Sequence, residues 1–418
     1  FCEPKIVVNV EKTQAFLDAA ITTSVNAIEQ SGLDRKTLAS NQKFSAWAEE
    51  QGLKVPTKTS PTTGKKIPAF GKNDAAFRQW TQQNPEFAHV FAGREAVKSR
   101  LNETRAQRFI DSTNAEGCIP APLRYYAAHT GRFGGTEKIN LQNLPRGSEL
   151  RRVLEAPEGK LMYVADLSNI ESRMLAWLAG QDNLLEMYYH GADVYCAFAS
   201  NLYKRTITKA DEVERFVGKT AILGLGYGMG AHKFMATLKT ANIELPFEEC
   251  DEAVNAYRST YSAIPALWEQ SERILKQTLS LKQGERFAYE YKCLQAAPSA
   301  IMLPNGMGLR YHDLERLNNG KMSYKSGKKT EFTYGGKIAE NIIQALARIV
   351  ICEQMLAIQE LPEFEVVLTV HDEIIAISDD TNPQDKMDTM LSIMRTAPSW
   401  ASDLPLDAEG GWDKCYSK

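Results

Sequence analysis

The chain is poor in the residues that build disulfide frameworks, zinc sites and membrane anchors. Its 418 residues include seven cysteines, an odd number without Cys-x-x-Cys spacing, and six histidines that form no ligand cluster. A disulfide framework and a structural zinc site are therefore excluded as organising features. No apolar run has the length of a bilayer span, and the N-terminus lacks the basic-then-apolar pattern of a signal peptide. These absences predict an intracellular protein that does not associate with a membrane.

The chain also lacks an excess of charge of either sign. It has 49 Lys and Arg residues against 52 Asp and Glu residues, a formal net charge of −3, so any attraction to a polyanion must come from local groups. Basic groups lie between Lys54 and Lys72, between Arg94 and Arg108, and between Lys321 and Lys329; the last receives no specific role. A length of 418 residues with 43% hydrophobic content predicts a large core divided into subdomains.

Two acidic signatures are what the sequence does contain. Asp166-Leu-Ser-Asn-Ile-Glu-Ser-Arg173 follows a strand-like apolar run, and His371-Asp372-Glu373 interrupts another. The second signature predicts a hairpin turn. The first predicts a strand that gives way to a helix, whose start is marked by the capping-box spacing of Ser168 and Glu171. Asp372 is then expected to face Asp166 from a neighbouring strand, where the two carboxylates can share divalent metal ions.

Between the signatures lies a predicted helix with an unusual stripe. The stripe has one residue at every fourth position, namely Arg215, Lys219, Leu223 and Tyr227. On a helix these side chains lie on one face and point towards the same region. Two cations four residues apart repel each other, and a polyanion between them gives a reason for the arrangement. The alternative is a solvated basic face, but such a face does not need Leu223, Tyr227 and the glycine-rich end that follows.

These residues resemble the family A (polymerase I-like) DNA polymerases, in particular the phage-encoded branch. Asp166 to Arg173 resembles motif A, Arg215 to Gly228 resembles motif B, and His371-Asp372-Glu373 resembles motif C. Thr130-Gly-Arg132 and Asn140 to Pro145 are similar to the primer-template segment, and Glu340 to Gln344 is similar to the helix that touches the duplex minor groove. The five motifs occur in the family's order over nearly the whole chain.

The resemblance implies an α+β right-hand polymerase fold, with a thumb, a palm built on an antiparallel sheet and helical fingers. The expected boundaries are 1–104 for the thumb, 105–185 and 346–418 for the palm, and 186–345 for the fingers. The upstream region has no Asp-x-Glu site of a proofreading exonuclease. Because the chain does not begin with methionine, we expect a fragment, a processed product or a trimmed chain. Members of the family often carry such a domain further towards the N-terminus.

The implied chemistry is nucleotide transfer to a primer 3′ end with two Mg²⁺ ions, for which Mn²⁺ can substitute. Mg²⁺ prefers carboxylate and carbonyl oxygens. We therefore expect Asp166, Asp372 and the backbone carbonyl of Leu167 as ligands, and Asp166, Asp372 and Lys219 as the catalytic residues. Glu373 is a weaker candidate, which would act through water.

The nucleotide site implied by the resemblance surrounds the predicted stripe. Lys219 and Arg215 are expected to hold the triphosphate, with Lys219 also protonating pyrophosphate. Glu171 has two interpretations, a helix cap or a gate that excludes the ribose 2′-hydroxyl while bonded to Tyr227. Tyr195 stands where relatives carry a histidine, and Leu223 stands where most carry an aromatic residue, which predicts altered discrimination against dideoxynucleotides.

The expected partners are primer-template DNA and deoxynucleoside triphosphates, bound by a monomer in the cytoplasm of a bacterium or a phage-infected cell. The resemblance places Arg132, Gln344 and His371 at the primer terminus and its minor groove, with Asn140, Gln142 and Asn143 nearby. Three other functions compete with DNA polymerisation. A single-subunit RNA polymerase typically lacks glutamates at positions 171 and 373, a silent binding protein tends to lose the metal aspartates, and a nuclease does not explain the Arg215 to Tyr227 helix.

Overall fold

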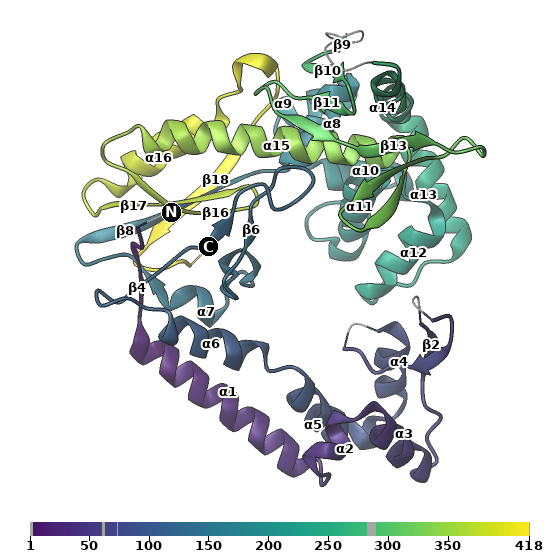
Figure 1. Cartoon of the computed structure of the whole chain (residues 1–418), viewed down its shortest axis with the longest axis vertical. Coiled ribbons are helices and arrows are strands. Elements are labelled where there is room, and N and C mark those ends of the chain that lie inside the picture. Colours follow the sequence, from purple (N-terminus) through teal and green to yellow (C-terminus); the bar gives the residue numbers. More distant parts are fainter. Residues whose placement is uncertain (1–2, 61–62, 73, 282–289, 418) are drawn as a thin grey trace. The chain divides into compact units, whose positions relative to one another are not determined.

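A computed structural model describes residues 3–60, 63–72, 74–281 and 290–417 (Figure 1). The chain divides into two compact units. Unit 1 consists of Phe1–Pro4, Ala121–Arg146 and Ala156–Lys418, and unit 2 consists of Lys5–Pro120 and Gly147–Glu155. The expected thumb, palm and fingers boundaries stay predictions beside this division.

Unit 2 is mainly helical, with short strands at its base. Its helix α1 packs against α5 and α6, and Phe44, Phe70, Trp80 and Phe91 belong to a second core. The strands pair in the order β4-β1-β7, with a separate β2-β3 hairpin. The elements are β1 (Ile6–Val8), α1 (Val10–Gln30), α2 (Arg35–Ala39), α3 (Asn41–Glu50), β2 (Thr57–Thr59), β3 (Lys66–Pro68), α4 (Ala75–Gln83), η1 (Pro85–Phe87), α5 (Ala88–Lys98), α6 (Leu101–Asp111), β4 (Cys118–Ile119), α7 (Glu149–Arg152) and β7 (Leu154–Glu155).

The basic residues between Arg94 and Arg108 do not form one exposed cationic face. Arg94 is buried, donates to the carbonyl oxygen of Leu38 at 2.7 Å and lies over the ring of Phe44 at 4.2 Å. Burial lowers the pKa of Arg94 to about 10. Arg100 pairs with Glu103 at 2.6 Å. Arg94 therefore packs within the core of unit 2, while the side chain of Arg100 stays more than half exposed.

Unit 1 combines a four-stranded antiparallel sheet with two helical layers and smaller sheets. Its elements up to the fingers-like helices are β5 (Leu123–Arg124), β6 (Gly134–Gly135), η2 (Leu141–Asn143), β8 (Lys160–Leu167), α8 (Ile170–Ala179), α9 (Asp182–Tyr189), α10 (Val194–Tyr203), α11 (Glu212–Leu225), α12 (Ala231–Thr240), α13 (Phe247–Thr260) and α14 (Ala263–Ser280). They are followed by β9 (Glu290–Tyr291), β10 (Leu294–Ala297), β11 (Ala300–Met302), β12 (Gly308–Arg310), β13 (His312–Arg316), β14 (Met322–Ser326), β15 (Lys329–Thr333), α15 (Gly335–Gln359), β16 (Glu365–Val370), β17 (Glu373–Asp379), α16 (Pro383–Arg395), η3 (Ser399–Ala401) and β18 (Ala408–Asp413).

The main sheet has the order β16-β17-β8-β18 and carries both acidic signatures. Strand β8 lies inside it and is buried from Met162 onward, which explains its continuous apolar sequence. Strands β16 and β17 form the predicted hairpin, with His371 and Asp372 in the turn between them. The backbone of His371 is left-handed, with φ of 58°. The predictions of a strand before Asp166 and of a hairpin at His371-Asp372 are confirmed.

The predicted capping box at the start of α8 is wrong. The helix begins at Ile170, its N-cap residue is Asn169 with φ of 56°, and no side chain caps it. Ser168 lies outside the cap position, and the carboxylate of Glu171 is bonded elsewhere, to Arg132 and Tyr227. The cap interpretation of Glu171 is thereby removed.

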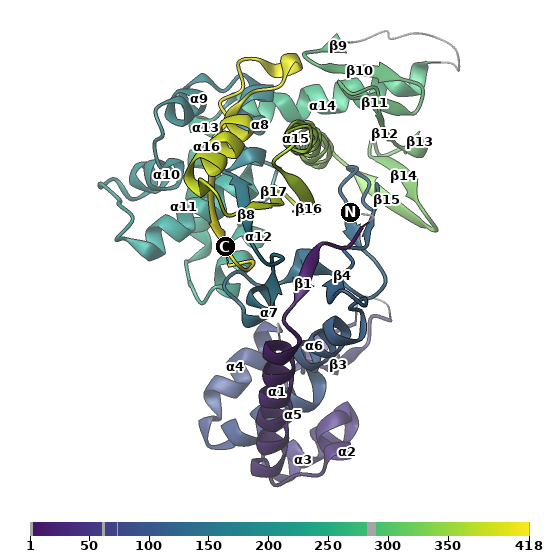
Figure 2. The same cartoon turned by 90° about the vertical axis from the view of Figure 1, so that its left-hand side faces the viewer.

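Helix α15 is the apolar centre of unit 1. By length and composition alone it is long and apolar enough to cross a membrane. The prediction that no apolar run reaches this length was therefore wrong for α15. Most of its residues are buried, including Ile338, Ile342 and Leu346, and it packs against α8, α14, α16, β16 and β17. Figure 2 looks along α15, with β16 and β17 beside it. A helix covered on nearly all sides needs this apolar sequence for the core.

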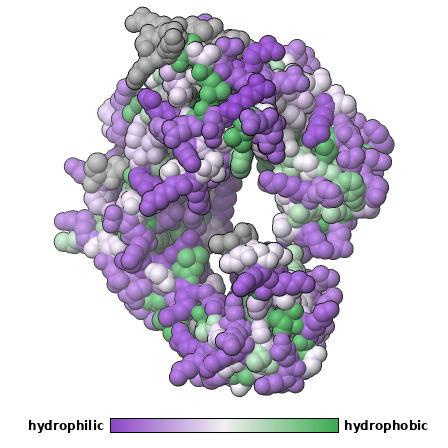
Figure 3. Space-filling view, turned by 45° about the vertical axis from the view of Figure 1, so that its right-hand side comes forward, coloured by the Kyte–Doolittle hydropathy of each residue, from purple (hydrophilic) through white to green (hydrophobic). Residues whose placement is uncertain are grey.

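The visible surface carries its hydrophobic residues in small patches separated by hydrophilic ones (Figure 3). Among the described residues, four aromatic side chains are more than half exposed, namely Tyr125, Tyr189, Phe332 and Tyr334. Two of these four, Phe332 and Tyr334, stand two residues apart at the end of one strand.

Candidate active site

Most of the predicted site residues line one pocket of unit 1, with a volume of about 620 Å³. The pocket lies between the end of β8, the start of α8 and one face of α11. It contains nine predicted residues, which are Asp166, Leu167, Glu171, Tyr195, Arg215, Lys219, Leu223, Tyr227 and Asp372. Residues that were 206 positions apart in the sequence are thus gathered around one space.

Asp166 and Asp372 form the acidic end of this pocket. The backbone NH of Leu167 donates to the carbonyl oxygen of Asp372 at 3.0 Å, which ties the β16-β17 turn to the end of β8. Burial and the neighbouring charge of Asp166 raise the pKa of Asp372 to about 6. A cation bound beside Asp372 would offset the negative charge that disfavours its ionised form.

Arg146 is a site residue that the sequence analysis missed. Its Nη2 atom pairs with Oδ2 of Asp166 at 2.6 Å, although most of the arginine side chain is exposed. The charge of Asp166 raises the pKa of Arg146. The sequence carries no signal for this contact, because Arg146 stands alone between Pro145 and Gly147.

Helix α11 forms the cationic wall of the pocket, but its two cations differ. Nε and Nη2 of Arg215 both bond Oδ2 of Asp193 at 2.9 Å, and the guanidinium lies over the ring of Tyr195. Lys219 is exposed, and within the described part of the chain no carboxylate pairs with it. Lys219 is therefore the cation in this wall that is available to an anionic ligand.

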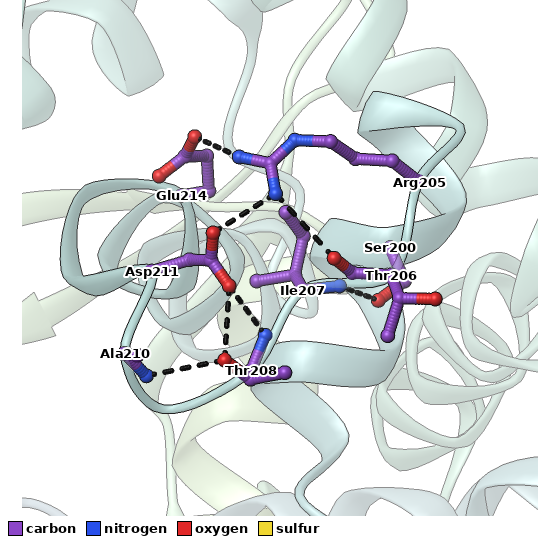
Figure 4. Close-up of polar contacts among 8 residues, drawn as sticks. All are labelled: Ser200, Arg205, Thr206, Ile207, Thr208, Ala210, Asp211 and Glu214. Atoms are coloured by element: carbon purple, nitrogen blue, oxygen red, sulfur yellow. Dashed lines mark hydrogen bonds and ion pairs between the residues drawn. The ribbon is translucent and has the colours of Figure 1, made fainter.

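The start of α11 is fixed by a polar network in the α10-α11 connection (Figure 4). Asp211, the residue before the helix, accepts from the backbone NH of Thr208 at 2.8 Å and pairs with Arg205 at 2.9 Å. Arg205 also pairs with Glu214 in the first turn. The bonds from Thr208 and Arg205 lower the pKa of Asp211 to about 2.

Close packing fixes the middle of the same helix. A Cβ atom at Gly218 would fall on the carbonyl oxygen of Tyr195, so only glycine lets α11 approach α10 at this level. The helix ends at Leu225. Tyr227 therefore lies two residues beyond the helix and not on it, although it still lines the pocket.

A second polar group lies at Glu171 and Tyr227, which both line the pocket. Arg132 and Glu171 form an ion pair, and the hydroxyl of Tyr227 donates to Oε2 of Glu171 at 3.5 Å. Burial, followed by the charge of Arg132, lowers the pKa of His371. Four residues from four predicted motifs are thus brought together.

Tyr195 occupies its predicted place, but its hydroxyl is engaged. The phenol is buried and donates to Oδ1 of Asn169, the N-cap residue of α8. Burial raises the pKa of Tyr195. The residue therefore links α10 to the start of α8 and offers its ring, more than its hydroxyl, to the pocket.

Two further glutamates flank Asp166 in the sheet, because Asp166 is paired with Glu373 on β17 and with Glu409 on β18. Glu373 is 2% exposed and accepts a hydrogen bond from the hydroxyl of Tyr416. Glu409 lines the pocket, which Glu373 does not. The sequence reading selected Glu373 and missed Glu409, whose proximity depends on the strand order.

The predicted DNA-contacting residues outside the pocket differ in how far their side chains are exposed. Gln142 is buried and donates to the carbonyl oxygen of Thr369 at 3.3 Å, and Asn140 caps η2. Asn143 is exposed. In α15, residues 341–350 are all buried except Gln344, which is partly exposed.

A model of DNA polymerase family A matches residues 9–418. The chain belongs to this family. Among relatives, it is 29% identical to a DNA polymerase of Bacillus phage SP02, over 91% of this chain and 63% of that protein. It is 25% identical to the thermostable DNA polymerase I of Thermus thermophilus, over 82% of this chain and 39% of that protein. The chain thus spans less than two thirds of the length of these relatives.

A solved structure shows the same fold at low sequence identity. It is described as the POL domain of Pol1 from M. smegmatis in complex with DNA primer-template and dNTP, and it matches 99% of this chain and 67% of its own with a TM-score of 0.73 and 19% identity. The predicted family and the predicted α+β polymerase fold are confirmed.

The residues of this family A site fit a divalent cation. Oδ1 of Asp166 is buried and has no hydrogen-bond partner among the described residues, and burial together with the charge of Asp166 raises the pKa of Asp372. No cluster of three or more metal-binding side chains exists within the described ranges. Two carboxylates without a protein cage are typical of Mg²⁺, which keeps waters and substrate phosphates as its other ligands.

Proposed function

We propose that this chain is a template-directed DNA polymerase, which adds deoxynucleotides to a primer 3′ end by phosphoryl transfer assisted by two Mg²⁺ ions. One observation carries the proposal. A pocket of about 620 Å³ has Asp166 and Asp372 at one end and the exposed Lys219 on its wall. A triphosphate that bridges a metal and a lysine needs both charges in one space.

The proposal extends to partners and organisation. Primer-template DNA and a dNTP are named as the ligands of the M. smegmatis protein, and we assign both classes to this chain. We infer a monomer with a thumb, palm and fingers, without proofreading in this chain, in the cytoplasm of a bacterium or phage-infected cell. A processivity partner is not assigned.

In the proposed mechanism the carboxylates of Asp166 and Asp372 would hold the cations, with the carbonyl of Leu167 as a further ligand. Mg²⁺ held there would supply Lewis-acid chemistry that favours the ionised primer 3′-hydroxyl and offsets negative charge on the α-phosphate. Lys219 binds the triphosphate and donates a proton to the leaving pyrophosphate oxygen. Arg215, held over Tyr195 by Asp193, adds positive potential beside it.

The sugar and the base are positioned by other residues that line the pocket. Tyr227 and Leu223 cover the nucleotide, and Glu171 occupies the space beside its 2′ carbon. Arg132 and His371 approach the primer terminus, and Gln344 reaches the minor groove, whose acceptors are common to all base pairs. Asn143 is a further contact. For Gln142 the bond to Thr369 supports a structural part in holding η2 on β16.

The proposed function is tested by primer extension with Mg²⁺, using deoxynucleotides and ribonucleotides in separate reactions. We expect extension with deoxynucleotides alone. Preferred use of ribonucleotides would show an RNA polymerase, binding without extension would show a silent protein, and shortening of the DNA would show a nuclease.

Arg146 is expected to compete with the metal for Asp166. Arg146→Gln removes the ion pair to Oδ2, and exposed pairs contribute up to about 1 kcal/mol, so Mn²⁺ should bind the variant about two- to fivefold more tightly without nucleotide. Electron paramagnetic resonance of free Mn²⁺ measures this affinity. Arg152→Gln, at an exposed arginine of α7, is the control. Unchanged or weaker Mn²⁺ binding would contradict the competition.

Leu223 is expected to relax the choice of sugar. Leu223→Phe places a flat ring against the sugar, so its ratio of dideoxynucleotide to deoxynucleotide incorporation should change by about tenfold or more, since one such contact is worth on the order of 1–3 kcal/mol. Single-nucleotide incorporation kinetics measure the ratio. An unchanged ratio would remove Leu223 from sugar discrimination.

Glu171 is expected to exclude the ribose hydroxyl. Glu171→Ala opens space beside the sugar and frees Arg132 and Tyr227, so ribonucleotide incorporation should rise by about tenfold or more relative to deoxynucleotide incorporation. Glu171→Gln, which keeps the volume, is the matched control. A Glu171→Ala enzyme that rejects ribonucleotides as strongly as the parent would tell against the gate.

A further inference from the structure

The strand that leads into α15 presents an unusual exposed face next to the proposed nucleotide site. Strands β14 and β15 pair with Lys325 opposite Thr330 and Ser323 opposite Phe332. Directly paired residues share a face and alternate residues of a strand share a face. Tyr334 continues the extended backbone beyond β15. Lys325, Phe332 and Tyr334 therefore lie on one face, which we call the β15 face.

The β15 face is open at Phe332 and Tyr334, while the opposite face of the same hairpin is anchored at Tyr324. Phe332 is 62% exposed and Tyr334 is 52% exposed. On the other face, Tyr324 packs against the rings of Tyr311 and His129, with centroid distances of 5.0 and 5.6 Å. In Figure 2 β14 and β15 project as a ribbon. The aromatic anchor holds this ribbon, so its two exposed rings are not a consequence of disorder.

The charge of the hairpin is mainly positive. Lys325, Lys328 and Lys329 are exposed, and in the described parts of the chain no carboxylate forms an ion pair with any of the three. Lys325 instead donates to the hydroxyl of Thr330 at 2.7 Å. Glu315 of β13 accepts from Ser323, and Glu331 of β15 is exposed. These two carboxylates offset part of the positive charge, and the three lysines still outnumber them.

The β15 face runs directly into the proposed active site. The hydroxyl of Tyr334 donates to the carbonyl oxygen of Tyr227 at 3.5 Å. A Cβ atom at Gly336 would fall on that same carbonyl oxygen, so the start of α15 is pressed against the segment that follows α11. Tyr334 also borders a pocket of about 620 Å³ that Trp268 and Arg273 line.

We propose that the β15 face, with Lys328 and Lys329, binds the unpaired template strand ahead of the proposed nucleotide site. Exposed rings interleaved with cations bind single strands, because bases stack on the rings while the cations follow the phosphates. A duplex hides its base faces and cannot use Phe332 in this way. The inference rests on the proposed function, since it assigns a strand of the same substrate.

The test compares two primer-template duplexes that differ in the unpaired 5′ template overhang, one nucleotide or eight nucleotides long. Fluorescence anisotropy with the full chain should show about tenfold tighter binding of the long overhang, as expected from one or two stacked bases. Phe332→Ala should lose most of this ratio, and Lys328→Gln/Lys329→Gln should lose part of it. Leu356→Ala, at an exposed apolar residue of α15, should keep it.

The outcomes separate the inference from the proposed function. Equal binding of both duplexes by the parent, or a Phe332→Ala variant with the parent's ratio, would overturn the template assignment; a surface that serves a protein partner gives this result. First-nucleotide extension on the one-nucleotide overhang is measured in parallel. If extension is normal but the ratio is absent, only the template assignment fails. If the parent binds the long overhang more tightly but neither the parent nor any variant extends the primer, the proposed polymerase function fails.

Discussion

Asp372→Asn is expected to extend primers on the order of 10³-fold more slowly than the parent, since removing one metal-binding charge costs several kcal/mol of transition-state stabilisation. The amide keeps the size of the side chain and the backbone bond from Leu167. Asp380→Asn, at an exposed carboxylate just after the same hairpin, is the control and should extend normally. Single-turnover extension at saturating DNA measures the rate. A fast Asp372→Asn enzyme would contradict the metal site.

The same variant is expected to be more stable than the parent in EDTA at high pH. Asp372 has its pKa raised to about 6 by burial and Asp166, so its ionisation opposes folding, and the cost grows as pH rises from about 4 through 6. Asparagine lacks this cost. Urea unfolding should show no difference near pH 4 and on the order of 2 kcal/mol in favour of the variant at pH 8. An equal difference at both pH values would show a packing effect instead.

Lys219→Met is expected to lower the maximal rate of incorporation by about 10²- to 10³-fold, with little change in primer-template affinity. Lys219 faces the pocket without a carboxylate partner in the described ranges, so its charge is available to the triphosphate. Methionine keeps the length of the side chain. Lys209→Met, at an exposed lysine before α11, is the control. Rapid-quench incorporation measures the rate and anisotropy measures DNA binding.

One result would contradict the role of Lys219 in binding the triphosphate. If Lys219→Met weakened DNA binding while incorporation stayed fast, Lys219 would contact the DNA phosphate backbone instead. The triphosphate would then have to be held by Arg215 after release from Asp193, which Arg215→Lys tests, because a lysine cannot keep two bonds to Oδ2.

The parts of the fold that sequence could predict are those with strong local patterns. The apolar run before Asp166 and the β-branched runs on both sides of His371-Asp372-Glu373 predicted the strands and the turn, because buried strands are built from such residues. The spacing of Arg215, Lys219 and Leu223 gave the helix face that lines the pocket. Position 227 shows the limit of periodicity, since the pattern continues while the helix stops at Leu225.

The predictions that were wrong, and the contacts that were missed, depend on residues far apart in the sequence. Ser168 and Glu171 have capping-box spacing, yet Glu171 is taken by Arg132, 39 residues away. Glu409 reaches the pocket only because β18 pairs with β8. Arg94 sits in a basic run but points into a core of aromatic rings. No local rule reports such contacts, because they follow from strand order and helix packing.

The most direct test of the account counts bound metal. Mn²⁺ binding to the complex of the full chain with primer-template DNA and a non-hydrolysable dNTP is measured by electron paramagnetic resonance, for the parent, Asp166→Asn and Asp372→Asn. We predict two tightly bound ions in the parent and the loss of tight binding in both variants. Equal tight binding in all three proteins would contradict a metal site shared by Asp166 and Asp372.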